Sequence, residues 1–152
     1  MPADLTPRDP DYAARVEAQF AAQPFMRLLG ARLDHVAPGL VRIRLPVRAE
    51  LGQQHGYVHA GAAWSIADSA AGFAAQSLMA AEDGVLTVEL KINLLAPAEG
   101  AALVAEGRVE RAGRRLTVGR SDVYAEQPGT APRHVATALG TFMTMSGLDR
   151  RS

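Results

Sequence analysis

The stretch that decides the fold is AGAAWSIADSAAGFAAQSLMAA, residues 60–81. Apolar side chains surround almost the whole helix that this stretch would form, so the helix must be enclosed. The stretch is rich in alanine rather than leucine and contains Asp68 and Gln76, which favours a buried helix over a membrane span. The polar, glycine-bearing residues 52–61 precede it and are typical of a loop. We therefore expect a loop that leads directly into a long buried helix.

Segments with alternating apolar and polar residues flank this helix on both sides. In residues 86–94 the alternation places Leu86, Val88, Leu90, Ile92 and Leu94 on one face of a strand and Thr87, Glu89, Lys91 and Asn93 on the other. The other predicted strands are residues 31–36, 40–47, 102–111, 116–126 and 134–145, with an irregularity near Arg120. Residues 11–22 and 24–29 favour short helices. This order predicts an α+β fold, an antiparallel sheet of about six strands wrapped around one long helix.

Composition narrows the possible partners and sites. Sixteen basic and sixteen acidic residues cancel, which argues against nucleic acid or an anionic membrane as the main partner. The chain has no cysteine, so disulfides and thiolate ligands are excluded, and its four histidines show no metal-ligand spacing. Charges and prolines near the N-terminus do not fit an export signal, and we expect a cytoplasmic protein.

Two motifs give the sequence its specificity. His59-Ala60-Gly61 is followed by Asp68 nine positions after the histidine, and residues 87–98 have the sequence TVELKINLLAPA. Together they resemble the hotdog-fold acyl-CoA thioesterases similar to the phenylacetate-degradation thioesterases, over about residues 29–145. The family has a glycine where this chain has Ala60. The role implied for that position belongs to the backbone N–H, which alanine keeps.

The resemblance implies a hotdog fold and hydrolysis of an acyl-CoA without metal or organic cofactor, coenzyme A being part of the substrate. It also implies a site shared between two subunits. We expect one domain over residues 1–152, with residues 1–30 as an N-terminal helical cover and 31–146 as the core. A homodimer is expected because edge strands require a partner, and a dimer of dimers is left open.

Asp68 is the predicted central catalytic residue. A carboxylate in alanine-rich surroundings is costly to bury. Its nine-residue spacing from His59 and the glycine-bearing helix start favour a functional site. Asp68 could act as a general base or as a nucleophile. Backbone N–H groups of Ala60 and Gly61 at the helix start could hold the oxyanion of an attacked thioester.

Other candidates have an equally plausible structural role. Gln53 or Gln54 could orient water, His59 could polarise the helix start, and Thr87 could position water. The candidates for substrate binding are Trp64 for the acyl group, and Lys91, Arg111, Arg114 and Arg115 for the phosphates of coenzyme A. The alternatives to hydrolysis are a catalytically silent acyl-CoA-binding protein and, ranked lower, an acyl-thioester dehydratase or hydratase.

Overall fold

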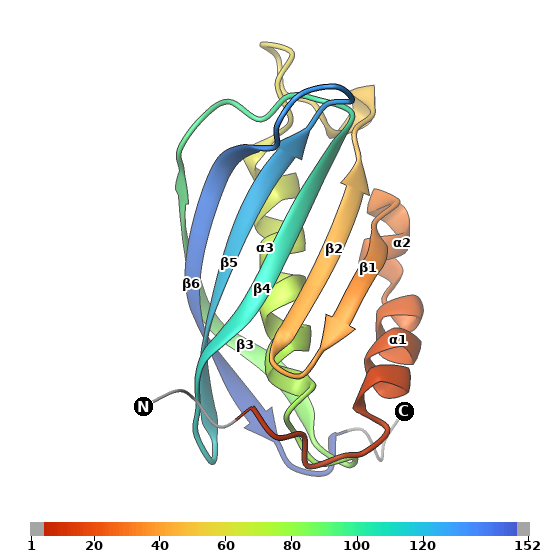
Figure 1. Cartoon of the computed structure of the whole chain (residues 1–152), viewed down its shortest axis with the longest axis vertical. Helices are drawn as coiled ribbons and strands as arrows, with labels where there is room; N and C mark the ends of the chain where they lie inside the picture. The colour runs from red at the N-terminus through yellow and green to blue at the C-terminus, as the bar shows by residue number, and fades with distance from the viewer. Residues whose placement is uncertain (1–4, 149–152) are drawn as a thin grey trace.

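Six strands form one antiparallel sheet around a long helix in the computed structural model, which describes residues 5–148 (Figure 1). The strands, in chain order, are β1 (Arg32–Ala37), β2 (Leu40–Pro46), β3 (Gly84–Leu94), β4 (Ala102–Ala112), β5 (Leu116–Glu126) and β6 (Arg133–Met145). Their order in the sheet is β1-β2-β4-β5-β6-β3. The helices are α1 (Tyr12–Ala22), α2 (Pro24–Leu29), α3 (Ala60–Gln76) and the short 3-10 helix η1 (Ala49–Leu51). The predicted α+β hotdog architecture is confirmed. Residues 1–4 and 149–152, which belong to the predicted domain, lie outside the described residues.

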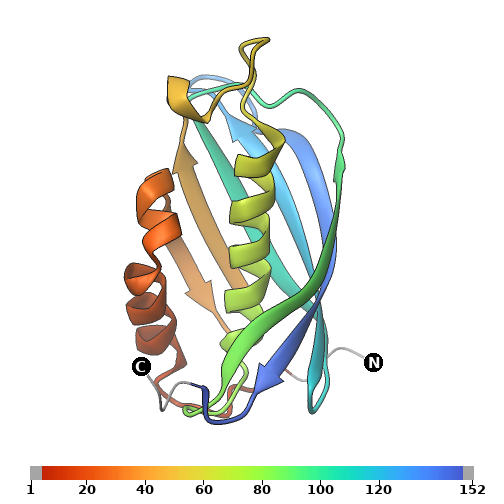
Figure 2. The ribbon, with the colours of Figure 1, turned by 180° about the vertical axis from the view of Figure 1, so that it is seen from behind.

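Small residues let α3 lie close against the sheet, which curves around it (Figure 2). The alanines of α3 that face the sheet are buried, among them Ala67, Ala70, Ala71 and Ala74. Gly107 of β4 shows how close the contact is, because a Cβ atom there would overlap the carbonyl group of Ala70. This closeness explains why the helix is built from alanine rather than leucine. No helix within residues 5–148 is both long and apolar enough to cross a bilayer.

The helix ends earlier than the sequence pattern predicts. We expected it to reach residue 81, but α3 stops at Gln76. The hydroxyl of Ser77 donates to the carbonyl of Ala74 (2.7 Å) and accepts the N–H of Gly39 (2.8 Å), which ties the helix end to the β1–β2 turn. The Arg15 guanidinium donates to the carbonyls of Gln76 and Met79. These tertiary contacts satisfy the free carbonyls of the helix end, so an apolar run does not continue as helix.

A bulge in β3 reverses the predicted faces of that strand before Glu89 but not after it. The pairing with β6 shifts between Thr87 and Glu89, so that Thr87 opposes Phe142, a fully buried residue on the helix side of the sheet. Strict alternation would place Thr87 on the face opposite Ile92, whereas Ile92 opposes the buried Ala138 and shares the helix side with it. The extra residue at the bulge therefore turns Thr87 toward α3.

The irregularity predicted near Arg120 is present, but the extra residues lie in β4 and β6 and not in β5 itself. Arg120 pairs regularly with both neighbouring strands, and the register of β5 shifts opposite residues 109–111 and at Val123/Tyr124. The inward positions of β5 near Arg120 are Gly119 and Ser121, both buried. Small and polar residues at inward positions, required by the nearby helix, gave the false impression of a phase slip within β5 itself.

The N-terminal helices pack beside α3 on the same side of the sheet (Figure 2). Val16 and Phe20 of α1 and Met26 of α2 are buried, and the ring of Phe20 meets that of Phe73 of α3 edge to face, with centroids 6.0 Å apart. Arg15 pairs with Asp9 (3.0 Å) while it holds the end of α3. The cover is therefore fixed against the C-terminal half of α3.

Candidate functional site

The start of α3 is held rigidly by the loop before it. His59 is the N-cap residue, and its Nδ1 accepts the backbone N–H of Gly61 at 2.8 Å. The backbone N–H of His59 donates to the carbonyl of Leu51, and that of Val58 to the carbonyl of Ala98, both at 2.8 Å. Glycine at position 61 avoids a tight contact, since a Cβ atom would lie only 3.0 Å from Nδ1 of His59. These contacts place His59 in a capping role.

The cap leaves the N–H of Ala60 as the donor at this helix end. Gly61 donates to His59 and Ala62 donates to the His59 carbonyl, whereas the N–H of Ala60 has no acceptor within residues 5–148. An N-terminal N–H with no partner, at the positive end of the helix dipole, suits a developing negative charge. Of the two donors expected from the sequence, Ala60 is the one that remains available.

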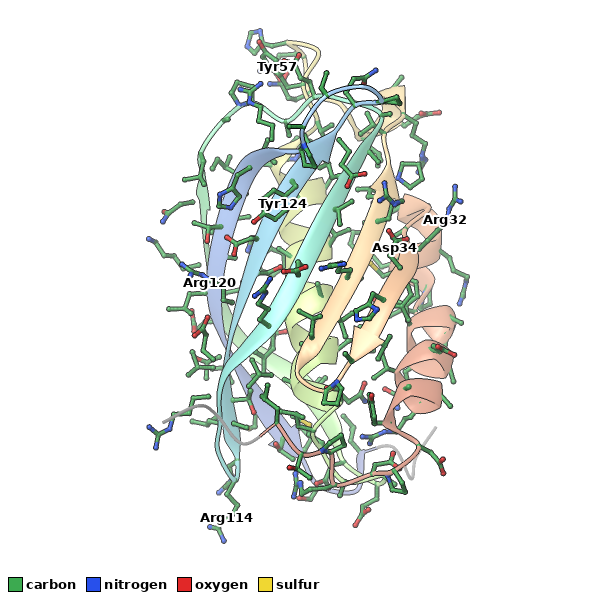
Figure 3. The ribbon with its side chains drawn as sticks, viewed as in Figure 1. Arg32, Asp34, Tyr57, Arg114, Arg120 and Tyr124 are labelled. Atoms are coloured by element: carbon green, nitrogen blue, oxygen red, sulfur yellow. The ribbon has the colours of Figure 1, made fainter. Side chains whose placement is uncertain are left out.

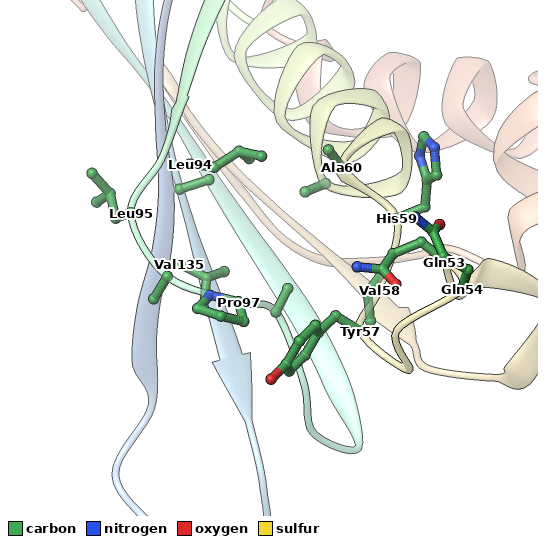
Figure 4. A pocket seen from close by; sticks show the side chains of 14 residues that line it. Gln53, Gln54, Tyr57, Val58, His59, Ala60, Leu94, Leu95, Pro97 and Val135 are labelled. Atoms are coloured by element: carbon green, nitrogen blue, oxygen red, sulfur yellow. The ribbon is translucent and has the colours of Figure 1, made fainter.

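A pocket of about 540 Å³ opens in front of this donor (Figure 4). Gln53, His59 and Ala60 form one wall, and Leu94, Leu95 and Pro97, at and just beyond the end of β3, form the facing wall. Gln54, Tyr57 and Val58 complete the loop side. The amide oxygen of Gln53 accepts the backbone N–H of His55, which fixes the loop and leaves the amide N–H₂ to the pocket.

Asp68 lies about two turns further along α3 than Ala60, and a residue of β3 holds its side chain. Its Oδ1 accepts the hydroxyl of Thr87 at 2.7 Å, a contact that the bulge in β3 makes possible. Burial raises the pKa of the Asp68 carboxyl above its ordinary value, and the hydrogen bond from Thr87 lowers that pKa in part. A carboxylate with a raised pKa and a fixed orientation is a better proton acceptor than an ordinary exposed aspartate.

Asp68 and Ala60 face different pockets within one chain. Asp68 and Thr87 line a second pocket of about 200 Å³, together with residues of α1, α3 and β3: Gln19, Gln23, Ser69, Gly72, Phe73 and Val85. The two residues are eight positions apart on one helix, which corresponds to about 12 Å along its axis. One carbonyl group cannot contact both the N–H of Ala60 and the carboxylate of Asp68 of the same chain.

The candidates for substrate binding are dispersed. Trp64 is 37% exposed and donates its indole N–H to the carbonyl of Leu90 at 3.3 Å, so it joins α3 to β3. Lys91 is exposed on β3 opposite Leu139, on the side away from α3. Arg111, Arg114 and Arg115 are exposed in and beside the β4–β5 turn, and Figure 3 shows Arg114 at the opposite end of the molecule from Tyr57.

Two site features escaped the sequence reasoning. Gln19 and Gln23 line the pocket beside Asp68, although no residue of the N-terminal cover was among the predicted site residues. Tyr57 lines the larger pocket. The two glutamines could have been identified from the sequence, because amide side chains in an alanine-rich segment need hydrogen-bond partners. Within residues 5–148, no cluster of histidine and acidic side chains could hold a metal ion.

Comparisons with known proteins agree on one family. The family model for the thioesterase superfamily matches residues 55–132. A thioesterase family protein from Silicibacter pomeroyi of known structure is 46% identical, with a TM-score of 0.87 over 90% of this chain and 99% of its own. A protein of Halobacterium salinarum, provisionally named an esterase, is 30% identical over 87% of this chain and 91% of its own length. The PaaI protein of the E. coli phenylacetic acid degradation operon is 20% identical and shares the fold, with a TM-score of 0.81 over 92% of this chain and 97% of its own.

Proposed function

Because the chain belongs to the thioesterase superfamily, whose chemistry is thioester hydrolysis, we propose that it hydrolyses acyl-coenzyme A to the free acid and coenzyme A. The observation that supports this proposal most is the half-buried carboxylate of Asp68, with its raised pKa and its hydrogen bond from Thr87. The first test is release of free thiol from acyl-CoA esters by the purified protein.

In the proposed reaction the N–H of Ala60 binds the carbonyl oxygen as it becomes negative. Asp68 either takes a proton from water, which then attacks the carbonyl carbon, or attacks that carbon itself to give a mixed anhydride that water hydrolyses. In both routes the C–S bond breaks and the leaving thiolate takes up a proton. Thr87 holds the carboxylate in one orientation, which lowers the entropic part of the activation free energy.

We further propose that two subunits share each site. About 12 Å along α3 separates Ala60 from Asp68 in one chain, so the oxyanion donor of one subunit must work with the carboxylate of another. A two-fold axis at the β3 edge would place the two β3 strands antiparallel. It would bring the start of α3 in one subunit toward the middle of α3 in the other. Such a dimer also directs the β4–β5 turn of one subunit, with Arg111, Arg114 and Arg115, toward the helix start of its partner, where these arginines could bind phosphates.

The dimer makes the first prediction. β3 is an edge strand, and its exposed apolar side chains include Leu86 (51%) and Val88 (55%), which a free edge would leave in water. Sedimentation at micromolar concentration should therefore give a species of at least two 16.1 kDa chains. Val88→Lys should weaken the dimer and lower activity with it, whereas Leu28→Lys, at an even more exposed site on α2 (69%), should do neither. A fully active 16.1 kDa species would contradict the shared site.

A second prediction concerns pH. Thr87→Val keeps the shape of the side chain but removes the hydroxyl that stabilises the Asp68 carboxylate, so the pKa of Asp68 should rise further. Because the reaction needs the deprotonated carboxylate, the acid limb of the kcat/KM profile should move to higher pH in the variant. Thr87→Ser keeps the hydroxyl and should leave the limb near its wild-type position. An unshifted limb in Thr87→Val would mean that Thr87 does not act through Asp68.

Dehydration or hydration of an acyl thioester has less support than hydrolysis. That chemistry requires a histidine and a carboxylate side by side for proton transfer at carbon. The Nδ1 of His59 is occupied by the N–H of Gly61, and its neighbours are those of a helix cap.

A further inference from the structure

The size and the lining of the pocket beside Asp68 indicate which acyl groups fit it. This inference rests on the proposed function. The volume of the pocket is about 200 Å³, below the range of about 300–1,000 Å³ typical of pockets for drug-sized ligands. An acyl group that extends from a carbonyl carbon next to Asp68 would enter this pocket, because the carboxylate forms part of its wall. The part of the site that this subunit contributes therefore has room for a short or single-ring acyl group.

The lining has an apolar part and a polar part. Phe73 and Val85 offer apolar surface, and Gly72 adds backbone without a side chain. On the other side lie Gln23 and Ser69, whose hydroxyl donates to the Oε1 of Gln23 at 3.5 Å. With Oε1 so engaged, the N–H₂ of Gln23 has no protein acceptor within residues 5–148 and can donate to a ligand.

The position of Gln23 is fixed by the backbone. Gln23 is both the C-cap of α1 and the N-cap of α2: its N–H donates to the Phe20 carbonyl (3.1 Å), and its own carbonyl accepts the N–H of Arg27 (3.3 Å). Pro24 follows at the first position of α2 and restricts the chain further. The backbone of Gln23 is therefore held in place, so that only its side-chain torsions remain to be ordered when the amide binds an acceptor.

We infer that Gln23 selects an acyl group that carries a neutral oxygen substituent away from its thioester carbonyl, such as a hydroxyl or keto group, over the same acyl group without that oxygen. The amide N–H₂ donates to that oxygen, while Phe73 and Val85 contact the carbon skeleton. A carboxylate at the same place is disfavoured, because the pocket contains Asp68 and no basic side chain lines it. The α1–α2 junction, outside the motifs of the resemblance, thus sets acyl specificity.

The test compares kcat/KM for acyl-CoA pairs that differ by one oxygen: butanoyl against 3-hydroxybutanoyl, and benzoyl against 4-hydroxybenzoyl. The wild type should prefer the oxygenated member of at least one pair. Gln23→Met has nearly the same length but cannot donate, and it should reduce that preference by about tenfold, the effect of losing one hydrogen bond to substrate. Gln127→Met, at an exposed position just after β5, is the matched control and should keep the preference.

The outcomes separate this inference from the function on which it rests. An unchanged preference in a folded, active Gln23→Met protein would overturn the inference, and so would a wild type that prefers the hydrocarbon member of both pairs. If Gln23→Met loses its fold, Ser69→Ala serves instead; it removes the hydroxyl that orients the amide and should shift the preference in the same direction. Failure of the wild type to release thiol from any acyl-CoA would instead overturn the proposed function.

Discussion

Asp68→Asn should lower kcat for acyl-CoA hydrolysis by about 10²–10⁴, the effect of removing a general base, and by more if the carboxylate is the nucleophile. Asparagine has nearly the same shape and can still accept the hydroxyl of Thr87, so the geometry of the pocket should persist. It cannot take a proton from water or attack a thioester efficiently. Binding of acyl-CoA should be largely retained, because the substitution affects the reacting end of the substrate.

The same substitution should not destabilise the fold. Burial raises the pKa of Asp68 in the folded protein above its unfolded value, so the folded state binds that proton more tightly. The stabilising contribution of this group is therefore present at low pH and is lost as pH rises through the folded pKa. Asparagine is neutral at every pH, and Asp68→Asn should be at least as stable as the wild type near neutral pH.

The measurements are kcat, acyl-CoA affinity and thermal midpoint on one preparation. Asp11→Asn is the matched control, because Asp11 is exposed at the start of α1 and its side chain caps nothing. It should leave all three quantities unchanged. Near-native kcat in folded Asp68→Asn would refute the catalytic role, and an unfolded variant would assign Asp68 to structure.

The fold followed from the sequence because its local signals agree with its tertiary structure. The alternation in residues 40–47 requires one buried face, and the apolar run from Ala60 requires burial on nearly all sides. A sheet curved around α3 buries both. Prediction failed where a distant contact decides the local structure. The end of α3 depends on Arg15 and on a hydrogen bond between Ser77 and Gly39, none of which a pattern within the helix records.

The candidate site was predictable only in part for a related reason. The spacing of His59 and Asp68 identified the helix, but the pairing of Asp68 with Thr87 depends on a bulge that no alternation pattern contains. The alternation in fact assigned Thr87 to the wrong face. Gln23 was missed because its relevance arises from the packing of α1 and α2 beside α3, a long-range arrangement.

The second large effect is expected from Ala60→Pro, which removes a single backbone N–H. Ala60 is the first residue of α3, where proline is tolerated because its N–H has no helical acceptor. His59 before it already has the extended conformation that proline requires of its neighbour (φ −61°, ψ 137°). Loss of one oxyanion donor should lower kcat by about 10²–10³ with the helix intact.

Ala60→Ser keeps the N–H and is the matched control; it should retain activity near that of the wild type. Circular dichroism and the thermal midpoint report on the helix in both variants. Wild-type kcat in a folded Ala60→Pro protein would mean that this N–H does not bind the oxyanion.

Ala60→Pro and Asp68→Asn together test whether subunits share the site. In a heterodimer of the two variants, a shared site formed from the intact Ala60 of one chain and the intact Asp68 of the other is complete, while the second site carries both defects. Random pairing makes half of the dimers mixed, so co-refolding equal amounts should restore about a quarter of wild-type activity in a two-fold dimer. Sites built within single chains would each keep one defect. Heterodimers that form, as native mass spectrometry would show, but remain inactive would therefore contradict a shared site and require Ala60 and Asp68 to act on separate steps within one subunit.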